Sequence, residues 1–362
     1  MNEPPDHLTR MDRFVNTLLL ALLILLGISG VVMLYGTWLA WLFDLHRMAG
    51  FALILLLPWK AITIYRSLSR GMGKTFDRSW VIFASWGMLH FVLLIIILAL
   101  IWMWRLRPYS TLTQTIIAWH WILGLLAIPW LALHAWRRWP RPSRQDLLSR
   151  RSFLQLMGLA AGGILLGELA NLLAQSQSTP QSPRRFTGSR AFGLFSGNDF
   201  PIFGEETIRL DLGTWRLAID GAVAAPQELT YQELLALVQE SKEAVIDCTS
   251  GWYSLQNWQG VPLVDLLSRA GAGEDIAGVR LFSASSYQHT FPIQEARTIL
   301  LATHVSGEVL APRHGYPLRA VVPGRRGWFW VKWLTRIEVL ASPWQVLAGT
   351  LDSPLQTLKQ WQ

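Results

Sequence analysis

The sequence predicts a membrane α-helical bundle of about five transmembrane helices, followed by a mixed α+β domain. The first half contains long apolar stretches joined by short, arginine-rich loops, and from about residue 191 short strand-like runs take over. A hydrocarbon core about 30 Å thick requires about 20 apolar helical residues. We therefore divide the chain into a transmembrane domain (1–150), a signal helix or tether with a linker (151–190), a folded domain (191–345) and a C-terminal tail (346–362).

Composition places the positive charge in the apolar half. The chain has a net charge of +8 and is 51% hydrophobic, and residues 1–151 contain 16 lysines and arginines against 6 acidic residues. Basic residues in short loops orient helices in a bilayer, so this charge does not indicate nucleic-acid binding. The single cysteine, Cys248, excludes an intramolecular disulfide.

Five apolar stretches account for the predicted bundle. They span roughly 14–34, 42–65, 79–103, 113–136 and 153–174. Arginine and lysine concentrate before the first stretch, between the second and third, and between the fourth and fifth. The positive-inside rule then places the N-terminus in the cytoplasm and the C-terminal domain outside. We expect a multi-pass protein of the plasma (inner) membrane with a periplasmic domain.

Four histidines lie within these stretches, where ionisable side chains are normally functional: His46, His90, His120 and His134. His120 and His134 are 14 residues apart, about 21 Å along a helix and nearly on one face. His46 matches the depth of His120, whereas His134 has His90 or His7 as its partner. This stretch resembles the membrane cytochrome b subunits of hydrogenases and formate dehydrogenases. The resemblance implies one or two b-type haems that exchange electrons with membrane quinone or quinol; polar contacts between helices are the alternative.

The residues between the two halves contain a second motif. Residues 149–155 read Ser-Arg-Arg-Ser-Phe-Leu-Gln and resemble a twin-arginine export signal, which carries folded domains across a membrane. The alternative is that these arginines only hold the cytoplasmic end of a helix. No cleavage site is evident, so we expect the fifth helix to remain as a tether. Residues 175–190 are rich in serine and proline and predict a flexible linker.

The folded domain contains short strands and helices without regular alternation. Thr230 and Glu233 form a predicted capping box for a helix over 231–240. The absence of a glycine-rich loop between a strand and a helix makes a dinucleotide-binding fold improbable. Strands are predicted over 208–212, 215–220, 244–248, 279–283, 288–292, 318–323 and 337–340.

A series of landmarks characterises this domain. They are Cys248-Thr-Ser-Gly-Trp252, Trp258-Gln-Gly-Val-Pro-Leu263, His314-Gly-Tyr-Pro-Leu-Arg319 and Val331-Lys-Trp-Leu334. In this order they resemble the molybdopterin-binding domain of the sulfite oxidase superfamily, especially the branch of the periplasmic methionine-sulfoxide reductase catalytic subunit. The resemblance covers roughly 195–345 and implies a sulfite-oxidase-like α+β fold that binds molybdenum–molybdopterin.

The resemblance also implies residue roles. Cys248 is expected to be the catalytic thiolate ligand of molybdenum, a soft ligand suited to such a metal. Asn198 matches an asparagine that contacts the pterin, and His314, Arg319 and Lys332 match residues that hold the cofactor's phosphate. Arg325 and Arg326 are further phosphate candidates or an exposed charged turn, and Tyr287 lines the pocket or belongs to the core.

Two departures bear on the substrate. The arginines that follow the cysteine in sulfite oxidases are absent, and Ser250 stands where the methionine-sulfoxide branch has an acidic residue. We therefore expect an oxidoreductase that uses quinol-derived electrons to reduce a neutral sulfoxide-like or N-oxide-like group, on a small-molecule or protein-bound substrate. The alternatives are a quinone-reducing dehydrogenase of a small substrate such as sulfite, or a non-catalytic binding module on a cytochrome anchor.

Overall fold

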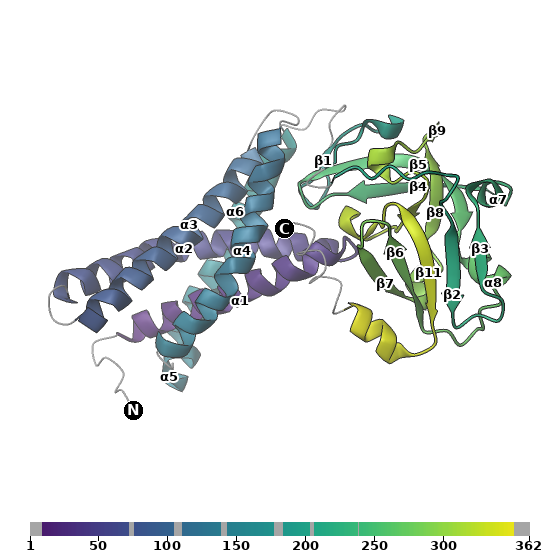
Figure 1. Cartoon of the computed structure of the whole chain (residues 1–362). Coiled ribbons are helices and arrows are strands. Elements are labelled where there is room, and N and C mark those ends of the chain that lie inside the picture. The colour runs from purple at the N-terminus through teal and green to yellow at the C-terminus, as the bar shows by residue number, and fades with distance from the viewer. Residues whose placement is uncertain are drawn as a thin grey trace. The chain divides into compact units, whose positions relative to one another are not determined.

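The computed structural model describes residues 9–71, 76–104, 111–138, 143–176, 184–202, 206–237 and 239–350. The chain forms two compact units, Met1–Gly188 and Ser189–Gln362, each with its own core. Figure 1 shows the first as a group of long helices and the second as a sheet-rich domain.

Within the part of the membrane unit that the structure describes, five helices are long and apolar enough to span a membrane, as the sequence predicted. They are α1 (Arg10–Tyr35), α2 (Ala40–Gly71), α3 (Phe76–Trp104), α4 (Thr111–Arg138) and α6 (Arg150–Ser176). A short helix that was not predicted, α5 (Arg144–Leu148), lies between α4 and α6.

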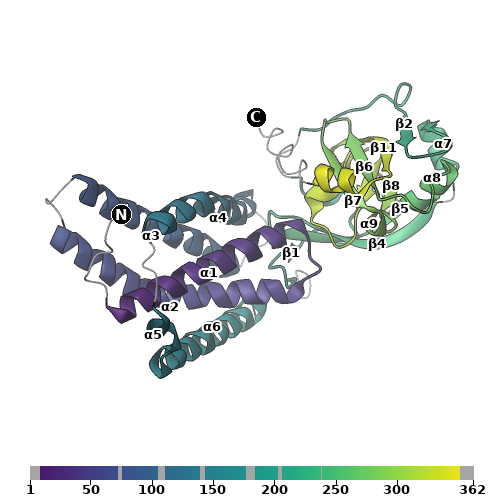
Figure 2. The same cartoon turned by 90° about the horizontal axis from the view of Figure 1, so that it is seen from below.

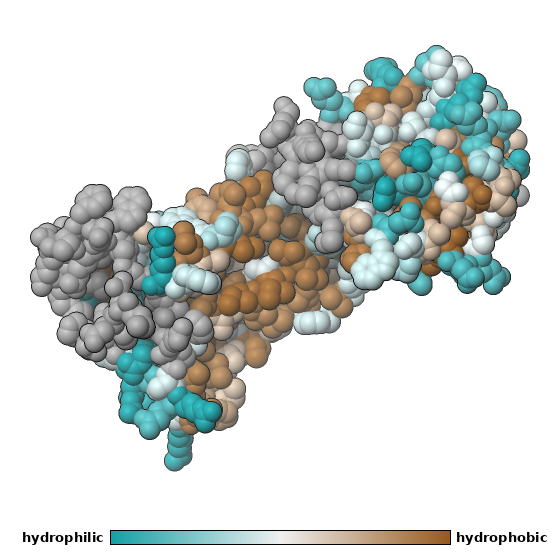
Figure 3. Space-filling view, turned by 60° about the horizontal axis from the view of Figure 1, so that its bottom comes forward, coloured by the Kyte–Doolittle hydropathy of each residue, from teal (hydrophilic) through white to brown (hydrophobic). Residues whose placement is uncertain are grey.

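Apolar side chains form both the core and the outer surface of this unit. The core cluster consists of Val15, Leu19, Leu53, Leu57, Ile64, Met88, Leu89 and Val92. Large apolar side chains also face outward, among them Ile28 on α1 and Leu172 on α6, and Figure 3 shows a broad hydrophobic surface over the helices. Apolar residues on every side are typical of a bundle that lipid surrounds.

Helix α6 packs closely along α2 (Figure 2). A Cβ atom added to Gly163 would lie 2.8 Å from the carbonyl oxygen of Met48 and 3.0 Å from the Cβ atom of Ala52. At Gly167 it would lie 3.2 Å from Cγ of Met48. Small residues of this kind allow two membrane helices to approach closely. Helix α6 is therefore an integral part of the bundle.

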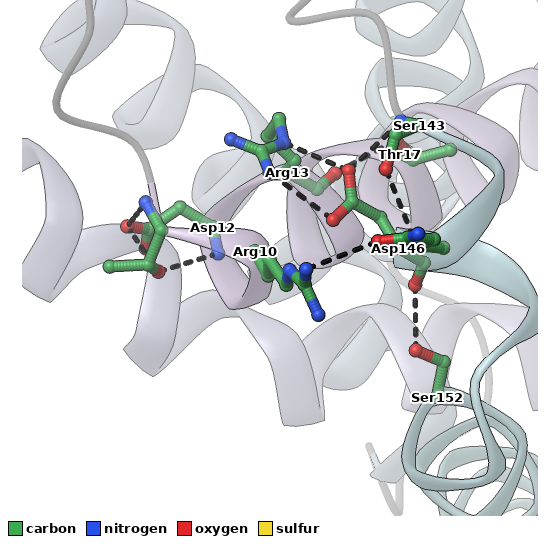
Figure 4. A network of polar contacts seen from close by, with 9 residues as sticks. Arg10, Asp12, Arg13, Thr17, Ser143, Asp146 and Ser152 are labelled. Atoms are coloured by element: carbon green, nitrogen blue, oxygen red, sulfur yellow. Dashed lines mark hydrogen bonds and ion pairs between the residues drawn. The ribbon is translucent and has the colours of Figure 1, made fainter.

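A polar network joins the start of α6 to the start of α1 (Figure 4). Nε of Arg13 lies 2.9 Å from Oδ2 of Asp146, whose side chain is fully buried. Asp146 also completes a capping box with Ser143 at the start of α5. The Ser152 hydroxyl donates to the Asp146 carbonyl oxygen at 2.6 Å. These contacts hold the segment with the twin-arginine-like sequence against the bundle.

Part of the predicted flexible linker is docked on the membrane unit. The Arg184 guanidinium donates to the Met103 carbonyl oxygen at 2.8 Å, at the end of α3. The Phe186 ring meets the Phe43 ring of α2 edge-on, with centroids 5.5 Å apart. The expectation of flexibility is therefore wrong for residues 184–188, because their side chains cap and cover the helix ends. Residues 177–183 lie outside the described residues.

The second unit is built on two sheets, in keeping with the predicted α+β class. The six-stranded sheet contains β1 (Arg190–Ala191), β4 (Glu240–Asp247), β5 (Trp252–Pro262), β8 (Leu300–Val305), β9 (Glu308–Val309) and β10 (Arg319–Val321). The five-stranded sheet contains β2 (Leu217–Gly221), β3 (Gln227–Leu229), β6 (Gly278–Ser283), β7 (Gln288–Pro292) and β11 (Leu334–Leu340). Strand β2 pairs in parallel with β11, so the beginning and end of the domain meet in one sheet.

Short helices complete the unit. They are α7 (Tyr231–Leu235), α8 (Leu263–Arg269), α9 (Ile293–Ala296), η1 (Gly197–Asp199), η2 (Pro312–His314) and η3 (Gly327–Phe329). The capping box of Thr230 and Glu233 is confirmed at the start of α7. This helix ends at Leu235, five residues before the predicted end.

The strand predicted over 208–212 is wrong. Its residues join no sheet, and Asp211 instead opens a turn in which the Trp215 amide donates to the Asp211 carbonyl oxygen at 2.8 Å. The Asp211 carboxylate accepts from the Gly213 amide at 3.0 Å. Aspartate stabilises turns in this way, and the turn replaces the end of the predicted strand.

Candidate functional site

Cys248 follows β4 directly, at the start of a tight turn into β5. The Cys248 amide donates to the Trp252 carbonyl oxygen at 2.8 Å, and the Gly251 amide donates to the Cys248 carbonyl oxygen at 3.0 Å. Gly251 has a φ of +91°, which favours glycine. The turn leaves the cysteine half-buried at the strand end, where the sequence predicted it.

The sulfur of Cys248 contacts a polar side chain within the described residues. Its Sγ atom lies 3.0 Å from Oγ of Ser250, and that serine is buried. Burial raises the pKa of the Cys248 thiol, while hydrogen bonds from Ser250 oppose this shift. A metal ion at the sulfur would favour its thiolate form.

The residue before the cysteine belongs to a buried ion pair. Oδ1 of Asp247 lies 2.5 Å from Nη1 of Arg326, and both side chains are buried. The Ser189 hydroxyl donates to the same Asp247 oxygen at 2.7 Å. The charge of Arg326 is thus balanced beside Cys248. Arg325 is likewise paired with Glu295, at 2.5 and 2.7 Å, so neither arginine forms the exposed charged turn considered above.

Asn198, His314 and Arg319 are brought together by direct contacts. Nε2 of His314 donates to the Asn198 carbonyl oxygen at 2.7 Å, and Arg319 donates to the His314 carbonyl oxygen at 2.9 Å. The side-chain amide of Asn198 is bonded to Glu308, Val309 and the Ala311 amide, at 2.7–3.0 Å. The side-chain amide of Asn198 therefore stabilises the loop, and its main-chain carbonyl oxygen orients the His314 ring.

Lys332 borders the same cluster. A Cβ atom on Gly315 would lie 3.1 Å from Cβ of Lys332 and 3.2 Å from Cβ of Arg319. Both side chains therefore begin close to this glycine. Gly315 has a φ of +112°. The Lys332 ammonium donates to the Arg313 carbonyl oxygen at 3.3 Å. The structure thus groups all four predicted contacts other than Cys248 around one loop.

Aromatic rings surround the Arg319 guanidinium. Its carbon lies 5.8, 5.6 and 5.7 Å from the ring centroids of Phe200, Trp258 and Trp330. The residue is 4% exposed. Rings at this distance attract a cation, and they fix its plane. The sequence did not identify Phe200 and Trp330 as members of this cluster. An aromatic residue in a loop has the same local sequence pattern whether it only packs in the core or also contacts a ligand.

Phe200 connects the cysteine turn to this cluster. Its ring lies 5.9 Å from the Trp252 ring, which ends the turn, and 4.0 Å from the His314 ring. Trp252 belongs to β5 and follows Cys248 by four residues. Ring contacts of Phe200 therefore link the end of the cysteine turn to the basic cluster.

Several buried polar atoms border this region, and within the described residues Nδ1 of His314 and Nε1 of Trp252 and Trp330 have no hydrogen-bond partner. Burial, followed by the charge of Arg319, lowers the pKa of His314 to about 3. Because Nε2 of this neutral ring is a donor, Nδ1 is an acceptor. Buried polar groups are normally bonded. One acceptor and two donors beside a cationic cluster fit a polar, anionic cofactor.

Tyr287 lies near this region but is bonded to the main chain. Its side chain is buried, and its hydroxyl donates to the Trp328 carbonyl oxygen at 2.9 Å. This contact favours a role in the core over the pocket-lining role.

The membrane unit contains a second arrangement, formed by His46 of α2 and His120 of α4. Their ring centroids are 6.3 Å apart, and the ring planes are inclined by 85°. This separation would allow both Nε2 atoms to bind one metal ion, at about 2 Å per bond. Nδ1 of His46 contacts Ser29 at 2.7 Å and Nδ1 of His120 contacts the Ile95 carbonyl oxygen at 2.9 Å. Each Nδ1 is thus engaged, which leaves Nε2 for a metal.

The other two intramembrane histidines are not brought into this pair. His90 stacks on Trp86 of its own helix at 5.1 Å, bonds to the Trp86 carbonyl oxygen and is exposed. His134 is half-buried on α4. His7, the other predicted partner of His134, lies outside the described residues. Haem binding by the His46–His120 pair and a second haem at His134 both stay predictions.

Comparisons with known proteins agree with the catalytic unit. The family model "Oxidoreductase molybdopterin binding domain" matches residues 205–347. "Uncharacterized oxidoreductase YuiH" of Bacillus subtilis is 31% identical over 167 residues, which are 45% of this chain and 81% of that protein. A nitrate reductase of Hordeum vulgare is 28% identical over 196 residues, but the match spans only 22% of its length.

A further relative matches more of this chain. "Putative protein-methionine-sulfoxide reductase subunit YedZ1" of Azospira oryzae is 27% identical over 218 residues, which are 54% of this chain and 83% of that protein. The match to the Bacillus protein and the family model agree with the sheets, the cysteine turn and the cationic cluster described above. The chain belongs to the oxidoreductase molybdopterin-binding domain family and is a molybdopterin-dependent oxidoreductase.

Proposed function

We propose that this protein is a membrane-bound molybdenum-cofactor reductase. It draws electrons from membrane quinol through b-type haem and reduces a sulfoxide-like or N-oxide-like substrate outside the cytoplasm. The observation that carries the proposal is the cluster of His314, Arg319 and Lys332, which ring contacts of Phe200 link to the end of the Cys248 turn.

The residues of this site have separable roles in the proposal. Cys248 supplies the thiolate that binds molybdenum, and Arg319 and Lys332 bind the anionic end of the cofactor through charge-assisted hydrogen bonds. His314 accepts a hydrogen bond at Nδ1, while Trp252 and Trp330 donate through their indole nitrogens. The cofactor, when bound, supplies two-electron oxygen-atom chemistry. The protein excludes water and fixes its orientation.

A neutral substrate is favoured by the charges next to Cys248. The residues that follow it, Thr249 to Trp252, carry no charge, and Arg326 is neutralised by Asp247. An oxyanion such as sulfite would lack a counter-charge from these groups. Reduction of a sulfoxide takes up two electrons and two protons and releases the sulfide and water. The name of the Azospira relative is in keeping with this direction.

The His46 and His120 pair supports the haem part of the proposal. Its centroid separation and its two engaged Nδ1 atoms suit coordination of one iron from both sides. A haem with two histidine ligands carries one electron at a time, so two transfers serve each turnover. In the proposal, quinol in the membrane donates the electrons to this haem.

Export of the catalytic unit is the third part of the proposal. Arg150, Arg151, Phe153 and Leu154 are exposed at the start of α6, as a recognised motif requires. Replacement of Arg150 and Arg151 by lysine keeps the charge, and we expect it to reduce export of a C-terminal reporter. Unchanged export would contradict the twin-arginine reading. A reporter active only in the cytoplasm would contradict the proposed location.

An anaerobic haem-reoxidation assay tests the function as a whole. The full chain, purified from a molybdenum-replete host, is reduced with a quinol analogue, and candidate oxidants are then added. We expect a sulfoxide or an N-oxide to reoxidise the haem. Reduction of the oxidised haem by sulfite would instead favour the dehydrogenase alternative. A preparation without molybdenum would contradict the cofactor assignment.

A further inference from the structure

Ser29 lies in the C-terminal third of α1 and contacts the ring of His46. It is 1% exposed. Its hydroxyl oxygen is 2.7 Å from the Leu25 carbonyl oxygen, 3.2 Å from the Leu26 carbonyl oxygen and 2.7 Å from Nδ1 of His46. The hydroxyl of a serine in a membrane helix normally donates a hydrogen bond to a carbonyl oxygen of the same helix. The additional contact with a histidine of α2 is not explained by helix formation.

A count of protons fixes the direction of this contact. A serine hydroxyl has one hydrogen and two lone pairs. Two oxygens at 2.7 Å require that hydrogen between them, so Ser29 donates to the Leu25 carbonyl oxygen. A lone pair of the hydroxyl oxygen then accepts a hydrogen bond from Nδ1–H of His46. Nε2 of His46 is consequently unprotonated, the form in which imidazole binds a metal.

The two rings are held by unlike partners. His120 donates to a main-chain carbonyl oxygen, that of Ile95, at 2.9 Å, which no substitution of Ile95 removes. His46 depends on the hydroxyl of one side chain. The rings are inclined by 85°, and a ring bonded on one nitrogen cannot turn freely about its bond to a metal. The orientation of the His46 ring is therefore controlled by Ser29.

We propose that Ser29 is a positioning residue that sets the plane and the donor strength of His46, and so the potential of the haem at this pair. The inference rests on the proposed haem function. A hydrogen-bond acceptor behind a metal-bound imidazole makes the ring a stronger donor. A stronger donor stabilises ferric iron and lowers the reduction potential. Loss of the Ser29 hydroxyl raises the potential and lets the ring turn.

The test compares the full-length wild type with Ser29→Ala, Ser29→Thr and Thr17→Ala. Thr17 is the matched control, because its hydroxyl also bonds to the main chain of α1, at Arg13, but not to His46. Redox titration followed by haem absorbance gives the potential. Low-temperature electron paramagnetic resonance gives the angle between the rings, because perpendicular imidazoles produce one low-field signal and parallel imidazoles produce three resolved signals.

We expect the wild type, Ser29→Thr and Thr17→Ala to share the low-field signal and one potential. Ser29→Ala alone should show a higher potential and a resolved three-line signal. Equal potentials and signals in all four proteins would overturn the inference, as would an identical shift in Thr17→Ala. Failure of the proposed haem function is distinguishable, because the wild type itself would then lack the absorbance of a bis-histidine haem.

Discussion

The membrane unit and the catalytic unit hold their candidate ligands in different ways. In the bundle, His46 and His120 each have one polar partner in apolar surroundings. Around Cys248, by contrast, the Ser250 hydroxyl contacts the sulfur, and the preceding residue, Asp247, is paired with Arg326 and accepts from Ser189. Single substitutions in the bundle should therefore have separable effects, whereas those near Cys248 should affect chemistry and folding together unless they remove only one contact.

The largest expected effect is that of Cys248→Ser. A hard, weakly acidic hydroxyl replaces a soft thiolate, so the electronics of the metal change while the contacts of His314, Arg319 and Lys332 remain. We expect loss of nearly all turnover, with molybdenum, pterin and haem retained. Reduction of the haem by quinol should persist. Wild-type turnover in this variant would remove Cys248 from catalysis.

Arg319→Ala separates cofactor binding from chemistry in the same unit. It removes a charge-assisted contact to the cofactor. It also removes the guanidinium that lies among the rings of Phe200, Trp258 and Trp330. We expect a low molybdenum content per protein, and turnover reduced in the same proportion. Full molybdenum content in this variant would contradict the role of Arg319 as a cofactor contact.

His120→Ala is the corresponding test in the membrane unit. The variant should lose the bis-histidine absorbance of at least one haem and all quinol-driven turnover. Turnover driven by a soluble artificial donor should stay near the wild-type value, because the cysteine turn is untouched. His90→Ala is a useful comparison, since His90 is exposed and stacks only on its own helix. An unchanged spectrum in His120→Ala would contradict the haem assignment at this pair.

Asp146→Asn should have a moderate effect on stability alone. The hydrogen bond from Arg13 holds the pKa of Asp146 well below its usual range. Loss of the charged contact should cost about 2 kcal/mol, seen as a lower melting temperature. Because the folded-state pKa is lowered, this contribution is present above the ordinary aspartate pKa of about 4 and is lost as the pH falls further.

The difference between the wild type and Asp146→Asn should therefore shrink in acid. Asp44→Asn provides the control, because Asp44 pairs with Arg47 at a more exposed position and such pairs contribute about 1 kcal/mol or less. A difference between the wild type and Asp146→Asn that stayed constant down to strongly acidic pH would contradict the ion-pair account.

The smallest expected effect is that of Ser250→Ala. Once the sulfur is a thiolate, only the Ser250 hydroxyl can donate across their 3.0 Å contact. Its removal should leave folding and molybdenum content unchanged and shift the molybdenum potential downward. Turnover should change by about fivefold, which corresponds to about 1 kcal/mol. Ser254→Ala, which removes a contact to Gly193 instead, should leave the potential unchanged.

The sequence predicted the parts of this molecule that depend on local pattern. Apolar length identified the five long helices, and the Thr230–Glu233 capping box identified the start of α7. Strand β5 escaped prediction, because its polar residues Gln256, Asn257 and Gln259 are typical of a loop. Its pairing with β4, β8 and β1 is non-local, and no local pattern encodes it.

In the candidate site too, local sequence motifs identified some residues and not others. Cys248, His314, Arg319 and Lys332 could be named from motifs. The partners that fix them, including Asp247, Phe200 and Ser29, could not, since a buried polar or aromatic residue has the same local pattern whether it packs or positions a ligand. Only the pairing of distant segments brings these residues beside their ligands.

The pairing of β2 with β11 has a consequence for biosynthesis. The register joins Ile219 to Ile337, so the five-stranded sheet cannot close until the last strand has left the ribosome. The membrane helices, α6 included, emerge long before that moment. A chain that stalls upstream of residue 334 would then insert a complete bundle while its five-stranded sheet stayed open.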